Sequence, residues 1–134
     1  MKSLTASLWE FWSQFECDGK PVPAYQDGAV PNGAEFPYIT FTPVRGRAFS
    51  TLPAYATVWC KYTGENSAAG IAQRIAIMDA IARAIPETGV RIHVPGGFVV
   101  MNRGSGDFLS GDTDPDDKTI LVGRVICEIT FYYE

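Results

Sequence analysis

The chain has 134 residues, of which 46% are hydrophobic, 13% aromatic and 19% charged. A chain of this length is typical of one domain with one core, so we expect a single α+β domain over residues 1–134. The aromatic content excludes a largely disordered chain. With 11 Lys and Arg against 15 Asp and Glu, the net charge of −4 disfavours a dedicated nucleic-acid-binding protein.

The first 35 residues predict a helix followed by a long loop. Apolar residues recur at helical spacing over residues 3–16, and Ser3 or Thr5 is suited to cap the start of that helix. Glu10 and Glu16 interrupt any apolar run, so we expect neither a signal peptide nor a membrane span, and a soluble intracellular protein. Residues 18–35 contain many Gly and Pro residues and are expected to form a loop.

Two strands and a second helix are predicted next. Residues 36–44 alternate in a run rich in aromatic and β-branched side chains, and residues 54–62 alternate again, which predicts an antiparallel pair of strands. Residues 67–85 change to helical spacing, with a predicted buried stripe that contains Ile71, Ile75, Met78, Ala82 and Ile85. A second stripe, made of alanines, would let a sheet or a neighbouring subunit approach closely.

The last third of the chain predicts three more strands. Residues 90–94 and 98–101 flank Pro95-Gly96-Gly97 and are expected to form a hairpin, residues 102–118 a loop, and residues 119–133 a long strand with a bulge at Gly123. The predicted order is therefore αββαβββ. This order favours an antiparallel, or partly mixed, sheet with two helices packed on one face.

No catalytic or metal-binding pattern emerges from the sequence. Cys17, Cys60 and Cys127 lack CxxC spacing and are expected to be reduced structural thiols. His93 lies in an alternating strand with no second histidine to partner it, and is expected to be a solvated strand residue. We therefore expect a protein that is not an enzyme and has no cofactor.

The acidic segment 107–117 shares part of the pattern of a calcium-binding loop. Asp112, Asp114 and Asp116 match the first three ligand positions of an EF-hand. Asp117, however, occupies the required glycine position, and no glutamate closes the loop, so an EF-hand is rejected. Two interpretations of the segment remain: a solvated loop tip, or a loop that binds a cation weakly.

Several further side chains are candidates for contacts with a partner. Arg45 and Arg47 are suited to phosphate or to acidic side chains, or they form a solvated turn. Trp59 and Lys61 are predicted on the outer face of the second strand, where Trp59 either contacts another subunit or packs under the 18–35 loop. With the four aspartates at 112, 114, 116 and 117, these residues form the predicted contact set.

One stretch is more specific than the rest. An aromatic helix, LWEFWSQF, precedes AYQDGAVPNGAEFPYITFTPV, in which a proline-bearing loop leads directly into a strand. This pattern resembles the phage and prophage minor capsid or tail terminator family, also called tail completion or head–tail joining proteins. The segments TVWCKYTGENS, AAGIAQRIAIMDAIARAI and TILVGRVICEITFYYE match the order of elements in that family, so the resemblance covers nearly the whole chain.

The resemblance implies a structural virion protein that is made in the bacterial host cytoplasm and assembles as a ring, a hexamer in that family. Such a ring caps the tail tube, contacts the tail tube protein and the head connector protein, and lets DNA pass only as cargo, without a cofactor or a membrane. An alternative is a small ligand-binding or enzymatic α+β domain with a pocket between the N-terminal helix, near Trp9 and Trp12, and the sheet.

Overall fold

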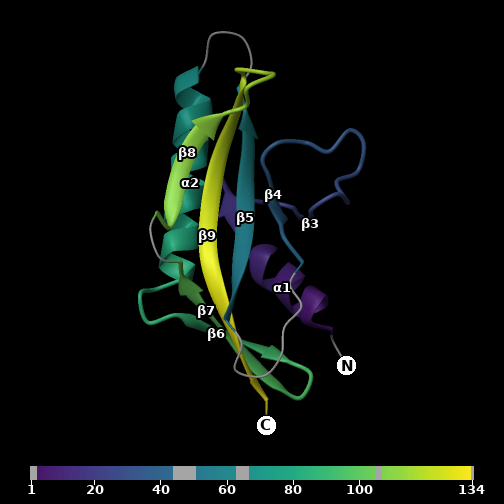
Figure 1. The fold of residues 1–134 in the computed structure, drawn as a ribbon. Helices are drawn as coiled ribbons and strands as arrows, with labels where there is room; N and C mark the ends of the chain where they lie inside the picture. Colours follow the sequence, from purple (N-terminus) through teal and green to yellow (C-terminus); the bar gives the residue numbers. More distant parts are fainter. Residues whose placement is uncertain (1–2, 44–50, 63–66, 105–106, 134) are drawn as a thin grey trace.

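The computed structural model describes residues 3–43, 51–62, 67–104 and 107–133, and it has an α+β fold (Figure 1). Arg45 and Arg47 lie outside these described residues. The elements are α1 (Leu4–Trp12), β1 (Glu16–Cys17), β2 (Lys20–Pro21), β3 (Ala24–Gln26), β4 (Tyr38–Phe41), β5 (Thr51–Lys61), α2 (Ser67–Ala84), β6 (Val90–Val94), β7 (Gly97–Arg103), β8 (Leu109–Thr113) and β9 (Ile120–Tyr133). The predicted α+β fold with two helices is confirmed.

Seven strands form one curled sheet in the order β3-β4-β5-β9-β7-β6, with β8 also paired to β9. The pairing of β3 with β4 is parallel, and every other pairing in this sheet is antiparallel. The mixed, mostly antiparallel sheet that the sequence predicts is therefore present. The long strand β9 lies at its centre, because β5 pairs along one side of it while β7 and β8 share the other side (Figure 1).

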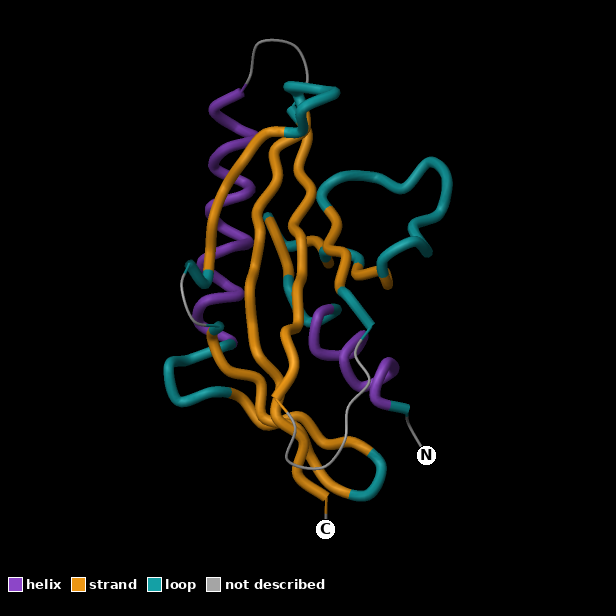
Figure 2. The backbone as a smooth tube through the Cα atoms, in the orientation of Figure 1, coloured by secondary structure: helices purple, strands orange, loops and turns teal. Residues whose placement is uncertain are grey.

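Both helices pack on one face of the sheet, and α2 lies partly behind the strands in the view of Figure 2. Alternate strand residues point to that face and join the inner sides of the helices in one apolar core. Its largest fully buried side chains are Leu8, Val22, Ile39, Phe41, Val58, Ile77, Ile81, Ile85, Val99, Met101, Ile129 and Phe131. Burial of this apolar surface is the main force that holds the layers together. The opposite face of the sheet carries neither helix and is called the open face below.

The buried side of α2 differs from the predicted stripe. Ile77, Met78, Ile81 and Gly70 are buried, whereas Ile71 and Ile75 are 40% and 52% exposed. The prediction was wrong for the first half of the helix because two apolar stripes compete there, one of isoleucines and one of alanines. At Gly70 an added Cβ would lie 3.0 Å from the Tyr62 Cβ, so the smallest residue, rather than an isoleucine, sets the side that approaches the sheet.

Two segments predicted as loops contain strands. Residues 18–35 include β2 and β3, and β3 becomes an edge strand because its backbone pairs in parallel with β4. Residues 102–118 include β8, in which Ser110, Gly111 and Asp112 pair with β9. Glycine and aspartate disfavour strands, so composition alone pointed to a loop. Backbone pairing with the edge of β9 overrides that preference.

Gly123 does not form the predicted bulge. The register between β5 and β9 is continuous through the Val58–Gly123 pair, and so is the register between β8 and β9. The missing side chain instead admits α2, because a Cβ at Gly123 would lie 2.5 Å from the Met78 sulfur. A glycine in a strand marks a close approach here rather than an inserted residue.

Candidate interaction surface

The open face carries a continuous group of aromatic side chains, which we call the aromatic ladder: Tyr25, Phe36, Tyr38 and Trp59. Ring centroids lie 5.8 Å apart for Tyr25 and Tyr38, 5.1 Å for Phe36 and Tyr38, and 6.3 Å for Tyr38 and Trp59. These spacings fall within the favourable range for aromatic pairs. The ladder crosses β3, β4 and β5 on the side away from the helices, so it is separate from the main core.

Trp59 lies on the open face, as the alternation of its strand predicts. Its indole Nε1–H donates a hydrogen bond to Thr40 Oγ1 at 2.9 Å, and its ring stacks on Tyr38. On the other side, Trp59 pairs across the strands with Val122, which is only 3% exposed although it faces away from the helices. Trp59 is therefore fixed in orientation while it remains half-buried, a combination that suits an interface anchor.

Lys61 and Asp117 meet at the end of the aromatic ladder. Lys61 Nζ lies 5.8 Å from the Phe36 ring centroid and 3.7 Å from Asp117 Oδ2. Asp117 Oδ1 accepts hydrogen bonds from Thr119 Oγ1 at 2.6 Å and from Thr119 N–H at 2.9 Å. These hydrogen bonds, and then the Lys61 charge, hold the pKa of Asp117 below its ordinary value of 3.8.

The other predicted contact aspartates shape the turn between β8 and β9. Asp112 Oδ1 accepts a hydrogen bond from Thr113 N–H at 2.8 Å. Asp114 Oδ1 accepts bonds from the N–H groups of Asp116 and Asp117 at 2.8 and 3.3 Å. These carboxylates thus act as local turn acceptors, and the part of the chain that the structure describes contains no group of three or more acidic, His or Cys side chains suited to a metal.

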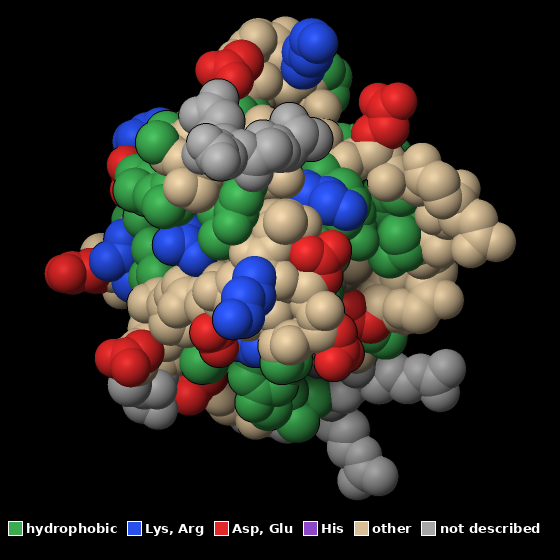
Figure 3. Space-filling model, turned by 90° about the horizontal axis from the view of Figure 1, so that it is seen from above, with side chains coloured by type: hydrophobic (Ala, Val, Ile, Leu, Met, Phe, Trp, Pro, Cys, Tyr) green, Lys and Arg blue, Asp and Glu red, His purple; other side chains and the backbone are tan. Residues whose placement is uncertain are grey.

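The structure brings four of the predicted contact residues together. Trp59, Val122 and Asp112 form one row across β5, β9 and β8, and Lys61 with Asp117 borders that row. Asp114 and Asp116 lie just beyond it in the turn. Seen from above, positive and negative side chains are interspersed with hydrophobic ones at this end of the molecule (Figure 3).

A second aromatic group on the open face was not anticipated from the sequence. Phe98 of β7 and Tyr132 of β9 stack with centroids 5.2 Å apart, and the Arg91 guanidinium carbon lies 4.1 Å from the Phe98 ring centroid. Tyr132 is 37% exposed, and Tyr55 on β5 is 46% exposed. The sequence feature that could have predicted this group is the alternation of residues 98–101 and 119–133. The outward positions of these two segments carry aromatic side chains at the far ends of the strands.

The cysteines show no sign of catalytic activation. Cys60 and Cys127 are fully buried, and desolvation raises the pKa of each thiol to about 12. Burial, followed by the charge of Asp18, also raises the pKa of Cys17 above its ordinary value of 9.0. A reactive cysteine requires the opposite shift, which favours the thiolate.

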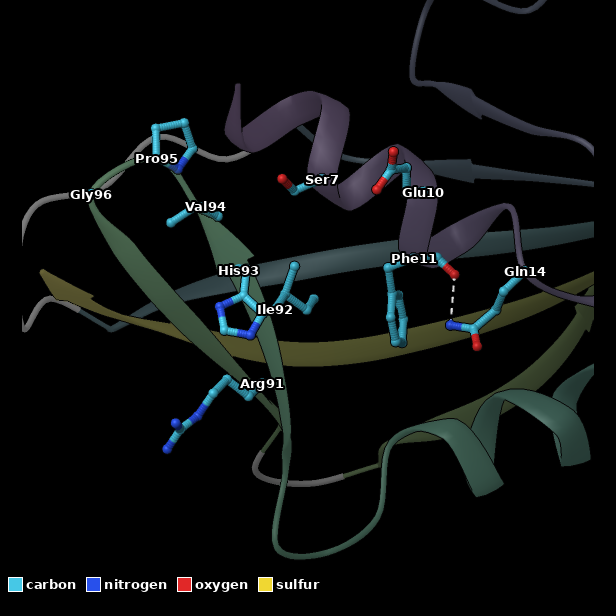
Figure 4. A pocket seen from close by; sticks show the side chains of 10 residues that line it. All are labelled: Ser7, Glu10, Phe11, Gln14, Arg91, Ile92, His93, Val94, Pro95 and Gly96. Carbon is cyan, nitrogen blue, oxygen red and sulfur yellow. Dashed lines mark hydrogen bonds between the residues drawn. The ribbon is translucent and has the colours of Figure 1, made fainter. Parts of the chain in front are cut away.

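A cleft of about 710 Å³ lies between α1 and β6 (Figure 4). Its lining includes Ser7, Glu10 and Phe11 from α1, and Ile92 and His93 from β6. This location matches the pocket expected for a ligand-binding or enzymatic domain.

The predicted tryptophan lining of that pocket was wrong. Trp12 is only 2% exposed within the core, and Trp9 directs its indole N–H to Ala24 O at 3.0 Å. Trp12 is therefore a core residue, and Trp9 binds the backbone of β3 instead of forming a wall of the cleft.

Comparisons with family models, with curated proteins and with solved structures found no match for the chain. Neither of the two described helices is long and apolar enough to span a membrane.

Proposed function

We propose that the chain is a structural phage or prophage virion protein, a tail terminator or head–tail joining subunit that assembles as a ring at the end of the tail tube. The observation that carries the proposal is the aromatic ladder on a sheet face that neither helix covers. The FPYITF segment and the order of elements resemble the tail terminator family, and this resemblance is the reason for proposing a ring on the tail tube.

One part of the open face, the aromatic ladder, has the composition of an interface core. Interface centres are enriched in Trp and Tyr and depleted in charge, with a polar rim around them. The aromatic ladder supplies such a centre, and Lys61 with Asp117 supplies charged groups at its edge. Trp59 is the anchor in this proposal, because its orientation is fixed by Thr40 before any partner binds.

Neighbouring copies would pack on the open face and on the exposed half of α2. Ile71 and Ile75 project from that helix with 40% and 52% of their surface exposed. The aspartates of the turn between β8 and β9 would then repeat around the ring, where they either repel passing DNA or contact a basic surface of the tail tube or head connector protein. No cofactor, membrane or chemical reaction enters this function.

The cleft between α1 and β6 favours a second candidate, a small ligand-binding or enzymatic domain. Its volume of about 710 Å³ is in the range of small-molecule sites. A metabolite that raised the melting temperature in a thermal-shift screen would support this candidate, since a ligand stabilises the folded state in proportion to its affinity.

The test is deletion of the gene in the phage or prophage that encodes it, followed by electron microscopy of the lysate. The proposal predicts unjoined heads together with tails whose length is no longer controlled, and rescue by the chain supplied in trans. Normal particles without the protein would contradict the proposal. Light scattering of the purified chain, alone and with tail tubes, then measures whether the ring forms alone or only on the tube.

A further inference from the structure

Among the described residues, β3, β8 and β6 each have an outer edge, and the chain protects the edge of β3. At β3, Trp9 Nε1–H donates to Ala24 O at 3.0 Å, and Ala29 N–H donates to Gln26 O at 2.9 Å. The carbonyl groups that β3 directs away from β4 are therefore already bonded. Natural proteins commonly protect edge strands in this way, because an unpaired edge recruits other chains.

At β8, Arg74 of α2 lies against the strand on the side of its partner β9, because Asp112 pairs with Val122. Arg74 of α2 donates from Nη1 to Asp112 O at 3.1 Å, and its guanidinium lies so close to Gly111 that an added Cβ would be 3.0 Å from the guanidinium carbon.

In the part of the chain that the structure describes, the outer edge of β6 has no such protection. The turn at Pro95 and Gly96 is closed by the Val94–Gly97 pair, and a turn of this length closes only with a hydrogen-bonded pair. Hydrogen-bonded pairs alternate in an antiparallel ladder, so the backbone N–H and C=O groups of Arg91 and His93 point away from β7. Among the described residues, none forms a hydrogen bond to these groups.

That free edge borders the cleft between β6 and α1 (Figure 4). Phe11 points down from α1 toward the sheet, and Ile92 lies opposite on β6, which gives the cleft an apolar floor. Arg91 turns its side chain away from α1, where its guanidinium lies over the Phe98 ring. Glu10 contributes a carboxylate to the lining on the α1 side of the cleft.

We propose that this cleft binds an extended segment of a partner polypeptide, which adds a strand to β6. Its backbone bonds to Arg91 and His93, as in other cases of strand addition. Because strand side chains alternate, every second residue of the segment faces Phe11 and Ile92 and is aliphatic, with a basic residue on the same side next to Glu10. The residues between them face solvent. This inference does not depend on ring assembly.

The test uses a labelled peptide, Lys-Thr-Val-Thr-Val-Thr with blocked ends, and the full chain. Fluorescence anisotropy measures binding, and amide hydrogen exchange by NMR measures protection of Arg91 and His93. A peptide with the same side chains but with every backbone nitrogen methylated is the first control, since it cannot donate hydrogen bonds. We expect the parent peptide to bind and to slow exchange of both amides at least about tenfold, and the methylated peptide not to bind.

Two substitutions at one position separate the backbone from the side chain. His93→Ala keeps the outward N–H and is expected to bind within about threefold of the parent chain, whereas His93→Pro removes it and is expected to bind at least roughly tenfold more weakly. Proline is tolerated here because that N–H takes no part in the ladder with β7, and circular dichroism checks the fold of both variants.

The proposal is overturned if the parent peptide fails to bind at about 1 mM, if the methylated peptide binds equally well, or if a folded His93→Pro variant binds like His93→Ala. Sedimentation velocity tests whether a second copy of the chain, instead of a partner, occupies the cleft. If the chain self-associates and the peptide dissociates it, the strand comes from a second copy, and the assignment to a partner is wrong. Should His93→Pro not fold, the methylated peptide and the exchange data still decide.

Discussion

Arg103 of β7 binds the C-terminal end of α2 through Ile85. Its Nε–H donates to Ile85 O at 2.8 Å, and its Nη2 donates to Ala82 O at 2.9 Å. The last carbonyl groups of a helix have no partner within the helix, and a cation is favourable at that end. The opposite side of the guanidinium faces the Phe108 ring, 4.7 Å from its centroid. One side chain therefore joins the helix to the sheet.

Replacing Arg103 with alanine is expected to lower the free energy of unfolding by about 2 kcal/mol, because two charge-assisted hydrogen bonds to helix carbonyls are lost. Urea denaturation measures the change. Arg83→Ala is the matched control, since Arg83 is an exposed basic residue in the last turn of the same helix, and a change below about 0.5 kcal/mol is expected. Equal effects of the two substitutions would contradict the role of Arg103.

The elements that could be predicted from sequence are those with strong periodicity. The alternation over residues 54–62 and 119–133, and the helical spacing over 67–85, correspond to β5, β9 and α2. The strands β3 and β8 were missed, because their residues have little strand preference and their pairing depends on edges formed by distant segments. Arg103 and Arg74 were missed for the same reason, since their acceptors are backbone carbonyl groups, which have no sequence signature.

The candidate surface was predictable only in part. Strand alternation placed Trp59 and Lys61 on the outer face, and the structure has both there. It could not place Asp117 beside Lys61, because that contact depends on the turn into β9. Residues at the ladder's other end, such as Tyr25, belong to the segment that composition assigned to a loop, so their stacking on Tyr38 could not be inferred.

Gly123→Ala is expected to destabilise the fold by about 1 to 3 kcal/mol, because the new methyl group would overlap the Met78 sulfur. The cost should be smaller in a Met78→Ala background, in which the overlapping atoms are absent. A double-mutant cycle by urea denaturation measures this coupling. Additive effects of the two substitutions would show that Gly123 acts through the backbone and not through Met78.

Thiol reactivity is expected to separate Cys17 from the other two cysteines. Cys60 and Cys127 have a pKa of about 12 and no exposed surface, so they should react with a thiol reagent only when the protein unfolds. Cys17 is partly exposed and should react in the native state, although slowly, because its pKa is also raised. Cys17→Ser should abolish the native-state reaction, and a persisting fast phase would contradict this assignment.

Asp117 should make the stability of the chain depend on pH in the acid range. Its folded-state pKa is lowered from 3.8, so its stabilising contribution is present above the unfolded value and is lost as the pH falls through the lower folded value. Asp117→Asn should therefore lower the melting temperature at about pH 6 and have little effect at about pH 2. Thr119→Val removes the hydroxyl donor and should show part of the same effect, whereas a difference that is independent of pH would contradict the mechanism.

In the proposed assembly, Trp59→Ala is expected to weaken association by about 2 kcal/mol while the far-ultraviolet circular dichroism stays unchanged, because Trp59 is the proposed anchor and lies on a face outside the main core. Trp59→Phe keeps a ring to stack on Tyr38 but loses the hydrogen bond to Thr40, so it should have a smaller effect. Thr57→Ala is the matched control on the same face of β5. Sedimentation velocity over a range of concentrations, with and without tail tubes, measures the association constants. If Trp59→Ala unfolds the subunit, the aromatic ladder is a second core that stabilises the monomer, and if it assembles like Thr57→Ala, the interface lies elsewhere.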